Sequence, residues 1–183
     1  MILIGVPCSE TIKSRTAFSL FYLASSETLL VIQRGCEVAE NRNKLAQRAL
    51  DKGYSHLLFV DSDMAFEPDT LNRMLAHEKD ILGLAANHRK LPLESVVKPL
   101  NESDLNQPLP TELFESQSVG TGVMLIKTEV FKKIPKPWFQ FTYENGKRIE
   151  GEDVRFCRLA REQGYSIWVD PTIPVSHLGE YAY

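Results

Sequence analysis

The chain has no long hydrophobic run and no long run of like charges among its 183 residues. Its longest apolar runs are far shorter than the ~20 residues that a membrane-spanning helix needs. Lys and Arg number 21 against 24 Asp and Glu, which gives a net charge of −3, and no basic run stands out. The sequence therefore gives no indication of a transmembrane segment or of a nucleic-acid partner.

Cysteine is scarce as well. Cys8, Cys36 and Cys157 form an odd, widely spaced set that suits neither a disulfide framework nor a zinc site. This usage favours a reducing compartment, so we expect a cytoplasmic protein. Residues 1–6 lack the basic segment and the cleavage site of a signal peptide and are typical of a first strand.

Hydrophobic patterning is present in the first half of the chain and alternates between strand and helix. It predicts strands over residues 2–6, 28–33, 56–60 and 80–85, helices over 12–24 and 37–51, and a third helix that starts at Pro68. In the first helix, the expected buried stripe consists of Ile12, Ala17, Leu20, Phe21 and Ala24. Because parallel strands need crossover connections, this order predicts an α/β fold with a parallel sheet covered by helices.

The second half of the chain is less regular. Residues 91–117 are rich in proline and predict irregular structure with one short strand near residues 95–98. Beyond them, the pattern predicts a strand over 120–126, a short helix over 128–133, a helix over 152–163 and a strand over 166–169. No repeat, low-complexity tract or linker divides the sequence, so we expect a single domain.

The most informative stretch is the apolar run at residues 57–60 with the three residues that follow it, Asp61, Ser62 and Asp63. Such a run is typical of a strand buried on both faces, and α/β sheets bind ligands at the carboxyl ends of their strands. Neighbouring carboxylates repel each other unless a divalent cation lies between them, and that cation would hold a phosphorylated ligand. An imidazole from His177 would favour Mn²⁺. The alternative is that Asp61 and Asp63 only cap the turn into the next helix.

Glu152 and Asp153 follow Gly151 at the predicted start of a helix. A general base has to stay ionised at the working pH and reach the hydroxyl that it deprotonates, and a helix N-terminus facing a cleft meets both needs. Helix capping explains the same pair without any catalytic role. The presence of the Asp-x-Asp motif in the same chain favours the catalytic interpretation.

Two arginines and a glycine-rich segment are further candidates for ligand contacts. Arg34 and Arg42 carry the planar guanidinium that suits a diphosphate or a nucleobase edge, although each is equally compatible with a solvated surface position. The basic cluster at residues 88–90 could meet a phosphate. Gly120 and Gly122 would allow a ligand to approach the backbone closely, but the chain has neither a phosphate-loop nor a dinucleotide-binding glycine motif.

Taken in order along the chain, these residues resemble the GT-A glycosyltransferases, in particular the family 2-like branch. The resemblance rests on Asp61-Ser62-Asp63 after a strand, Gly120-Thr121-Gly122 at a later strand, Gly151-Glu152-Asp153 before a helix, and His177 near the end. Residues 39–43 (AENRN) and 49–53 (ALDKG) are also similar to this branch. The resemblance covers nearly the whole chain and implies a single GT-A domain with a Rossmann-like, mostly parallel central sheet and flanking helices.

The resemblance also implies an activity, namely metal-dependent transfer of a sugar, of the hexosyltransferase type, from a UDP- or GDP-linked donor to a hydroxyl on a glycan, lipid or protein. Residues 1–90 would form the nucleotide-sugar-binding half, and residues 91–183 the half that binds the acceptor and completes the metal site. Asp61, Asp63 and His177 would hold Mn²⁺ or Mg²⁺, and Asp153, or in second place Glu152, would deprotonate the acceptor in an inverting reaction. The implied donor contacts are Pro7, Cys8, Arg34, Arg42, Asp61, Ser62, Asp63 and Gly122.

Other functions are compatible with parts of the sequence. A nucleotidyltransferase would share the α/β sheet, but the loop at residues 6–10 lacks the glycines and the arginine typical of that class. A phosphatase with an Asp nucleophile is disfavoured by the residues after Asp63, which are Met64, Ala65 and Phe66. A non-catalytic module that binds sugar nucleotides fits every motif, because fold and function are separable. The chain is also short for a GT-A enzyme, so the acceptor site is either minimal or completed elsewhere in a longer polypeptide.

Overall fold

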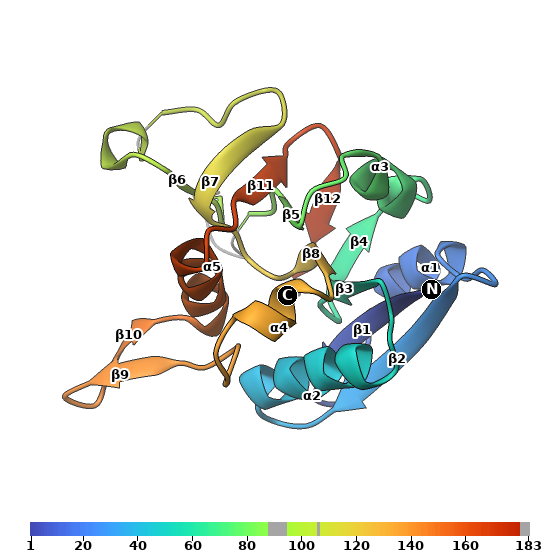
Figure 1. Cartoon of the computed structure of the whole chain (residues 1–183). Helices are drawn as coiled ribbons and strands as arrows, with labels where there is room; N and C mark the ends of the chain where they lie inside the picture. The colour runs from blue at the N-terminus through green and yellow to red at the C-terminus, as the bar shows by residue number, and fades with distance from the viewer. Residues whose placement is uncertain (88–94, 106, 180–183) are drawn as a thin grey trace, which may run out of the picture.

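A central sheet organises the chain, and helices cover both of its faces (Figure 1). The computed structural model describes residues 1–87, 95–105 and 107–179. Within these residues the sheet has eight strands in the order β2-β1-β3-β8-β5-β11-β7-β6. Its strands are β1 (Ile2–Cys8), β2 (Thr28–Arg34), β3 (His56–Val60), β5 (Ile81–Leu84), β6 (Lys98–Pro99), β7 (Phe114–Ser118), β8 (Val123–Lys127) and β11 (Ile167–Asp170).

The helices divide between the two faces of the sheet. They are α1 (Ser14–Tyr22), α2 (Val38–Asp51), α3 (Thr70–Ala76), α4 (Val130–Lys133) and α5 (Glu152–Glu162), with a 3₁₀ turn at Glu102–Asp104. Helices α2, α4 and α5 bury apolar residues in one core, and α1 and α3 bury theirs in the core on the opposite face. Two small sheets complete the described structure, β4 (Met64–Phe66) with β12 (Val175–His177) and β9 (Thr142–Glu144) with β10 (Lys147–Glu150).

The central sheet is mostly parallel, as predicted, but an antiparallel strand lies in its middle. β1 pairs in parallel with β2 and β3, and β11 pairs in parallel with β5. β8 lies between β3 and β5 and is antiparallel to both, and β7 is antiparallel to β11. The described part of the chain between β5 and β8 contains no α-helical crossover, so nothing requires β8 to run parallel to its neighbours. The predicted α/β class is therefore confirmed.

Most predicted elements are present with boundaries shifted by a few residues. The third helix begins at Thr70 rather than at Pro68, and the strand predicted from residue 120 begins at Val123. β4, β7, β9, β10 and β12 were not predicted. A recognisable signal existed for the β9–β10 hairpin, because Asn145 and Gly146 at its tip have φ values of 48° and 76° and Asn-Gly is the preferred pair for such a turn.

The first predicted helix is present as α1, but only part of the predicted stripe is buried, namely Leu20 in the core and Ile12 packed against it. Ser19 is buried, whereas Ala17, Phe21 and Ala24 are exposed. The Ser19 hydroxyl donates to the carbonyl oxygen of Phe66 at 2.8 Å and accepts from the Phe66 N–H at 3.0 Å. The predicted stripe is therefore wrong at Ala17, Phe21 and Ala24, and the buried serine that bonds to β4 takes a place on the buried face of α1.

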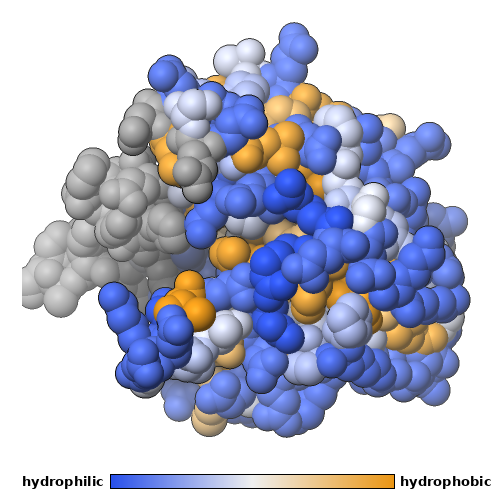
Figure 2. All heavy atoms as spheres, turned by 60° about the vertical axis from the view of Figure 1, so that its left-hand side comes forward, coloured by the Kyte–Doolittle hydropathy of each residue, from blue (hydrophilic) through white to orange (hydrophobic). Residues whose placement is uncertain are grey.

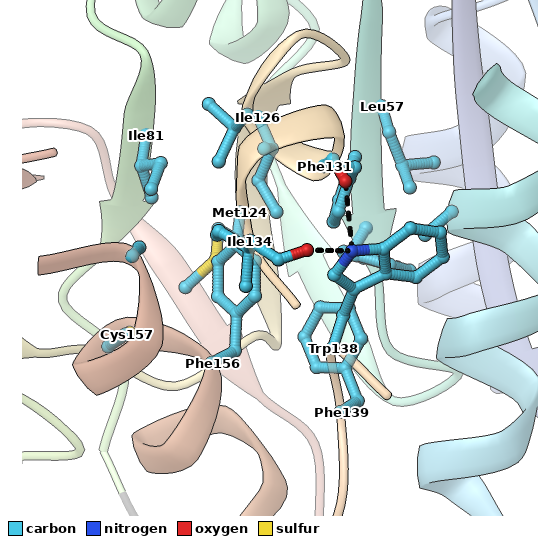
Figure 3. Close-up of a cluster of buried hydrophobic side chains, with 14 of the residues drawn as sticks. Leu57, Ile81, Met124, Ile126, Phe131, Ile134, Trp138, Phe139, Phe156 and Cys157 are labelled. Carbon is cyan, nitrogen blue, oxygen red and sulfur yellow. Dashed lines mark hydrogen bonds between the residues drawn. The ribbon is translucent and has the colours of Figure 1, made fainter. Parts of the chain in front are cut away.

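Trp138 lies in the larger of the two cores (Figure 3). Its Nε1 donates to the carbonyl oxygens of Phe131 and Ile134 at 3.0 and 3.1 Å, so its one polar atom is satisfied. The rings of Phe139 and Phe156 stack beside it with centroids 4.7 Å apart. Since Phe156 belongs to α5, this stack positions the N-terminus of that helix.

The outer surface is mixed in character. Figure 2 shows a mostly hydrophilic face on the side of the β9–β10 hairpin in Figure 1, with apolar side chains in small separate groups. None of the helices in the described ranges is both long and apolar enough to cross a membrane.

Candidate functional site

The Asp-x-Asp segment forms a turn at the carboxyl end of β3. The backbone N–H of Asp61 donates to the carbonyl oxygen of Gly122 at 2.8 Å, and the N–H of Met64 closes the turn on the carbonyl oxygen of Asp61 at 3.2 Å. A Cβ atom on Gly122 would lie 3.3 Å from the side chain of Met64, tighter than an ordinary contact. Gly122 thus fixes the backbone of the turn and is not among the residues that line the cavity beside it.

His177 lies beside Asp63, although the two residues are far apart in the sequence. β12 pairs antiparallel with β4 so that His177 lies opposite Met64, and the N–H of Leu178 donates to the carbonyl oxygen of Asp63 at 2.8 Å. His177 Nε2 is 3.5 Å from Asp63 Oδ1. The β4–β12 ribbon, visible in Figure 1, therefore brings together two of the three predicted metal ligands.

The second ring nitrogen of His177 contacts the backbone. Nδ1 lies 3.0 Å from the carbonyl oxygen of Asn87, and because that oxygen can only accept, we assign the proton to Nδ1. The lone pair of the neutral imidazole is then on Nε2, the atom next to Asp63. Histidines that bind metals commonly donate their other N–H to a backbone carbonyl in this way.

This pair of residues fits an open cation site rather than a closed one. In the described ranges, no group of three or more His, Cys, Asp and Glu side chains is arranged to hold a metal ion. Mg²⁺ and Mn²⁺ are commonly held by one or two protein ligands, with phosphate oxygens and waters completing the coordination. Asp63 and His177 match that requirement for a cation that binds together with a phosphorylated ligand.

A cavity of about 320 Å³ adjoins these residues at the carboxyl ends of β1, β2 and β3. Such a volume lies at the lower end of the range for small-molecule sites. The predicted site residues in its wall are Pro7, Cys8, Asp61, Ser62, Asp63 and His177. The structure thus gathers residues from β1, the Asp-x-Asp turn and β12 around one hollow.

The cavity wall also contains residues that the sequence analysis missed, namely Ser9, Gly35, Cys36, Val38 and Asn41. The N–H of Gly35 donates to the carbonyl oxygen of Cys8 at 3.0 Å, so the ends of β1 and β2 lie side by side. A Cβ atom on Gly35 would overlap the side-chain oxygen of Asn41, whose Nδ2 donates to the Gly35 carbonyl at 2.9 Å. The available signal was a glycine directly after a strand.

Arg42 is buried behind the Asp-x-Asp turn, with 2% of its surface exposed, and does not line the cavity. Its Nη2 donates to Asp61 Oδ1 at 2.8 Å, and its Nε donates to the Thr121 hydroxyl at 2.8 Å. Its guanidinium carbon lies 5.8 Å from the centroid of the Phe59 ring. Its Nε and Nη2 are thus engaged by protein groups, whereas its buried Nη1 has no hydrogen-bond partner among the described residues.

The two carboxylates at the N-terminus of α5 lie close to this arginine and to the glycine segment. Glu152 Oε1 is 3.9 Å from Arg42 Nη2. Asp153 Oδ1 accepts from the N–H of Val154 at 2.7 Å, and Asp153 Oδ2 is 3.7 Å from the position that a Cβ atom on Gly120 would occupy. The structure thus places the start of α5 next to the Asp-x-Asp turn.

Burial and Arg42 have opposite effects on the pKa values of Asp61 and Glu152. Burial raises the pKa of Asp61, and the positive charge of Arg42 counteracts part of that rise. Burial likewise raises the pKa of Glu152, again with Arg42 as the main opposing influence. Arg42 is therefore the counter-ion that favours the ionised form of both side chains.

Of two further predicted contacts, one lies outside the cavity wall and the other is not described by the structure. Arg34 is exposed at the end of β2 and does not line the cavity. The basic cluster at residues 88–90 lies outside the described residues.

Comparison with solved structures identifies the fold. The chain is similar to A197 from STIV, with a TM-score of 0.67 and 19% identity over 98% of this chain and 86% of that one. It is similar to S. aureus TarS 1-349 in complex with UDP-GlcNAc, with a TM-score of 0.62 and 16% identity over 100% of this chain and 59% of that one. It is also similar to GalNAc-T7 with UDP, GalNAc and Mn²⁺, with a TM-score of 0.59 and 12% identity over 98% of this chain and 44% of that one.

These likenesses confirm the GT-A type of α/β fold. Neither a family model nor a curated protein sequence matches the chain. At such low identity the structures establish the fold alone, so the activity has to be argued from the site.

Proposed function

We propose that this chain is a glycosyltransferase domain that transfers a sugar from a nucleotide-diphosphate donor to a hydroxyl acceptor. The proposal rests on the position of Asp63 and His177 in the wall of the cavity at the carboxyl ends of β1, β2 and β3. There, Asp63 Oδ1 lies 3.5 Å from His177 Nε2. A carboxylate and an imidazole at this place suit a divalent cation with a diphosphate. The UDP-GlcNAc in the TarS complex and the UDP and Mn²⁺ in the GalNAc-T7 structure support this choice.

Asp63 and His177 are the proposed protein ligands of Mn²⁺ or Mg²⁺. When bound, the cation neutralises the charge that develops on the departing diphosphate. Arg42 engages Asp61 Oδ1, so Asp61 would orient the turn and offer its other oxygen to the cation or the donor. Pro7, Cys8 and the neighbouring cavity wall would border the nucleoside.

Asp153 is the proposed general base. The nearest cation to Glu152 is Arg42 at 3.9 Å, which assigns Glu152 to holding the arginine and leaves Asp153, next to Gly120, for the acceptor. A carboxylate that takes the proton from an attacking hydroxyl fits direct displacement of the diphosphate, so we propose an inverting reaction. In this scheme residues 1–90 bind the donor, and residues 91–183 supply His177, Asp153 and the acceptor surface.

The proposed acceptor is a hydroxyl group on a glycan, a lipid or a protein. The proposed roles of the residues are the same for all three. The chain spans 59% of the TarS fragment and 44% of GalNAc-T7. We therefore base the test of the proposed function on donor binding, which the described cavity can support by itself.

Thermal unfolding with nucleotides tests the proposed donor site. We expect UDP, GDP or one of their sugar conjugates to raise the Tm in the presence of Mn²⁺ and to have little effect without it. At a ligand concentration of 100 times the Kd, binding stabilises the native state by about 2.7 kcal/mol, which corresponds to roughly 5–10 °C for a chain of this size. Asp63→Ala should abolish the metal-dependent shift because it removes a proposed ligand.

The matched control is Asp69→Ala, an exposed Asp outside the cavity wall, which should keep the full shift. A shift produced only by nucleoside triphosphates would instead indicate a nucleotidyltransferase. If Asp63→Ala retains the metal-dependent shift, the proposed cation site is wrong.

A further inference from the structure

The carboxylate of Asp170 is the centre of a hydrogen-bond network outside the donor cavity. Asp170 ends β11 and is 3% exposed, and it is the one acidic side chain among the buried residues of the described ranges. Its Oδ2 lies 2.7 Å from His77 Nε2. Its Oδ1 accepts from the N–H and from the hydroxyl of Thr172, each at 2.7 Å. Both oxygens of this buried group are therefore engaged by neighbouring segments.

Asp170 is ionised in this network. Burial by itself would raise the pKa of this carboxyl, but the hydrogen bonds from Thr172 and His77 outweigh burial, so the pKa is lowered. Because an ionised carboxylate can only accept, we assign a proton to His77 Nε2. A buried carboxylate contributes less to stability than an apolar side chain of similar size, whereas its directional hydrogen bonds hold its partners in one geometry. The network is therefore suited to fixing the position of the segments that it joins.

Two residues of α3 anchor the turn that follows β11. His77 caps the C-terminus of α3, and Arg73 lies in the last turn of the same helix. Arg73 Nη2 donates to the Thr172 hydroxyl at 2.9 Å, and that hydroxyl in turn donates to Asp170. In Figure 1 the connection from β11 to β12 passes next to α3. The turn is thus tied to α3 at two successive points.

This turn leads directly into β12, the strand that contains His177. Two residues separate Thr172 from β12, and the first of them, Ile173, is buried in the core to which α1 and α3 contribute. β12 has only three residues, and β4 is its single strand partner in the described ranges, so its position depends on both of its ends. The N–H of Leu178 holds the far end by donating to the carbonyl oxygen of Asp63. Thr172 holds the near end.

We propose that Asp170 is a positioning residue: by tying the turn after β11 to α3, it sets the position of β12 and so holds His177 beside Asp63. Asp170 does not line the cavity, and it acts through Thr172 and the backbone of β12. This role rests on the proposed function, in which His177 binds the cation. The placement of β12 itself can be measured with neither cation nor nucleotide present.

Hydrogen exchange of the full chain, followed by mass spectrometry of its peptides, measures how firmly β12 is held. Asp170→Ala removes both accepting oxygens, and His77→Leu removes the ring donor. Each should speed exchange across residues 175–178 by about tenfold or more, because the near end of β12 is released. His77→Gln should restore exchange at the wild-type rate, since the glutamine amide nitrogen can donate from nearly the same place as Nε2.

Glu150→Ala is the matched control for the loss of a hydrogen-bonded carboxylate. Glu150 accepts from Thr142 and Arg158 and lies off the path to β12, so its loss should leave exchange across residues 175–178 unchanged. Thr172→Val is a milder second variant that keeps the test possible if Asp170→Ala does not fold. It removes only the hydroxyl that links Arg73 to Asp170, and it should also speed the exchange.

Titration of Mn²⁺ in the presence of UDP measures the consequence for His177. The Kd for Mn²⁺ should rise about tenfold in Asp170→Ala and in His77→Leu, and it should stay at the wild-type value in His77→Gln and in Glu150→Ala. Unchanged exchange in the folded variants, faster exchange with an unchanged Kd, or an equal loss in His77→Gln would overturn the positioning role. Faster exchange in a chain whose wild type binds no Mn²⁺ would support the hold on β12 and contradict the proposed cation site instead.

Discussion

Asp153→Asn is expected to lower kcat by about 10²–10⁴-fold while leaving donor binding intact. Asparagine has nearly the same shape as aspartate but cannot accept the proton of an attacking hydroxyl. Asp153 is at the N-terminus of α5, next to Gly120, and is not among the residues that line the proposed donor cavity. Release of the nucleoside diphosphate in initial-rate assays measures transfer, and the metal-dependent Tm shift measures binding.

Two further substitutions separate a catalytic from a structural effect. Asp69→Asn makes the same chemical change at an exposed position and should leave the rate unchanged. Glu152→Gln should lower both the rate and the stability, because Glu152 is placed to support Arg42. Transfer at the wild-type rate in Asp153→Asn would show that the base has been assigned to the wrong residue.

Arg42→Ala is expected to destabilise the fold by roughly 2–4 kcal/mol and to abolish metal-dependent donor binding. The substitution leaves Asp61 without its 2.8 Å partner and Glu152 without the nearest cation. It also removes a side chain that packs against Phe59. Urea unfolding measures the loss of stability, and Arg48→Ala, an exposed arginine on the same helix, should change it by less than about 0.5 kcal/mol.

The loss of stability in Arg42→Ala should depend on pH. Burial already raises the pKa of Asp61 and Glu152, and without Arg42 both values rise further. The folded variant then takes up protons at a pH where the unfolded chain is still ionised, so acidification stabilises it relative to the wild type. The deficit should therefore be largest near neutral pH and shrink towards about pH 5. A deficit that does not change with pH would mean that lost packing, not lost charge, is the cause.

Short-range patterns were sufficient to predict the first half of the fold, which includes β3 and α2. The apolar run at residues 57–60 predicted β3, and the Asp-x-Asp after it predicted the turn at the edge of the cavity. The pattern also predicted α2, but it could not show which way the side chains of that helix point. Arg42 was considered as a ligand contact, and the structure engages it with Asp61 and Thr121 instead.

The parts that could not be predicted depend on contacts between distant segments. β12 is too short for a strand pattern, yet its pairing with β4 is what places His177 beside Asp63. Two hydrogen bonds between Ser19 and Phe66 help to orient α1, whereas apolar spacing alone predicted Ala17 and Phe21 on its buried face, where the structure exposes them. The reversed direction of β8 likewise follows from its long-range position between β3 and β5.

The most direct test of the metal site is pulsed electron paramagnetic resonance of Mn²⁺ added to the protein with UDP. We predict an echo modulation from a directly bound imidazole nitrogen, which should change when histidine is labelled with nitrogen-15 and disappear in His177→Ala. Asp69→Ala should leave the spectrum unchanged, since Asp69 does not line the cavity. Bound Mn²⁺ without any histidine coupling, or with the same coupling in His177→Ala, would contradict a cation held between Asp63 and His177.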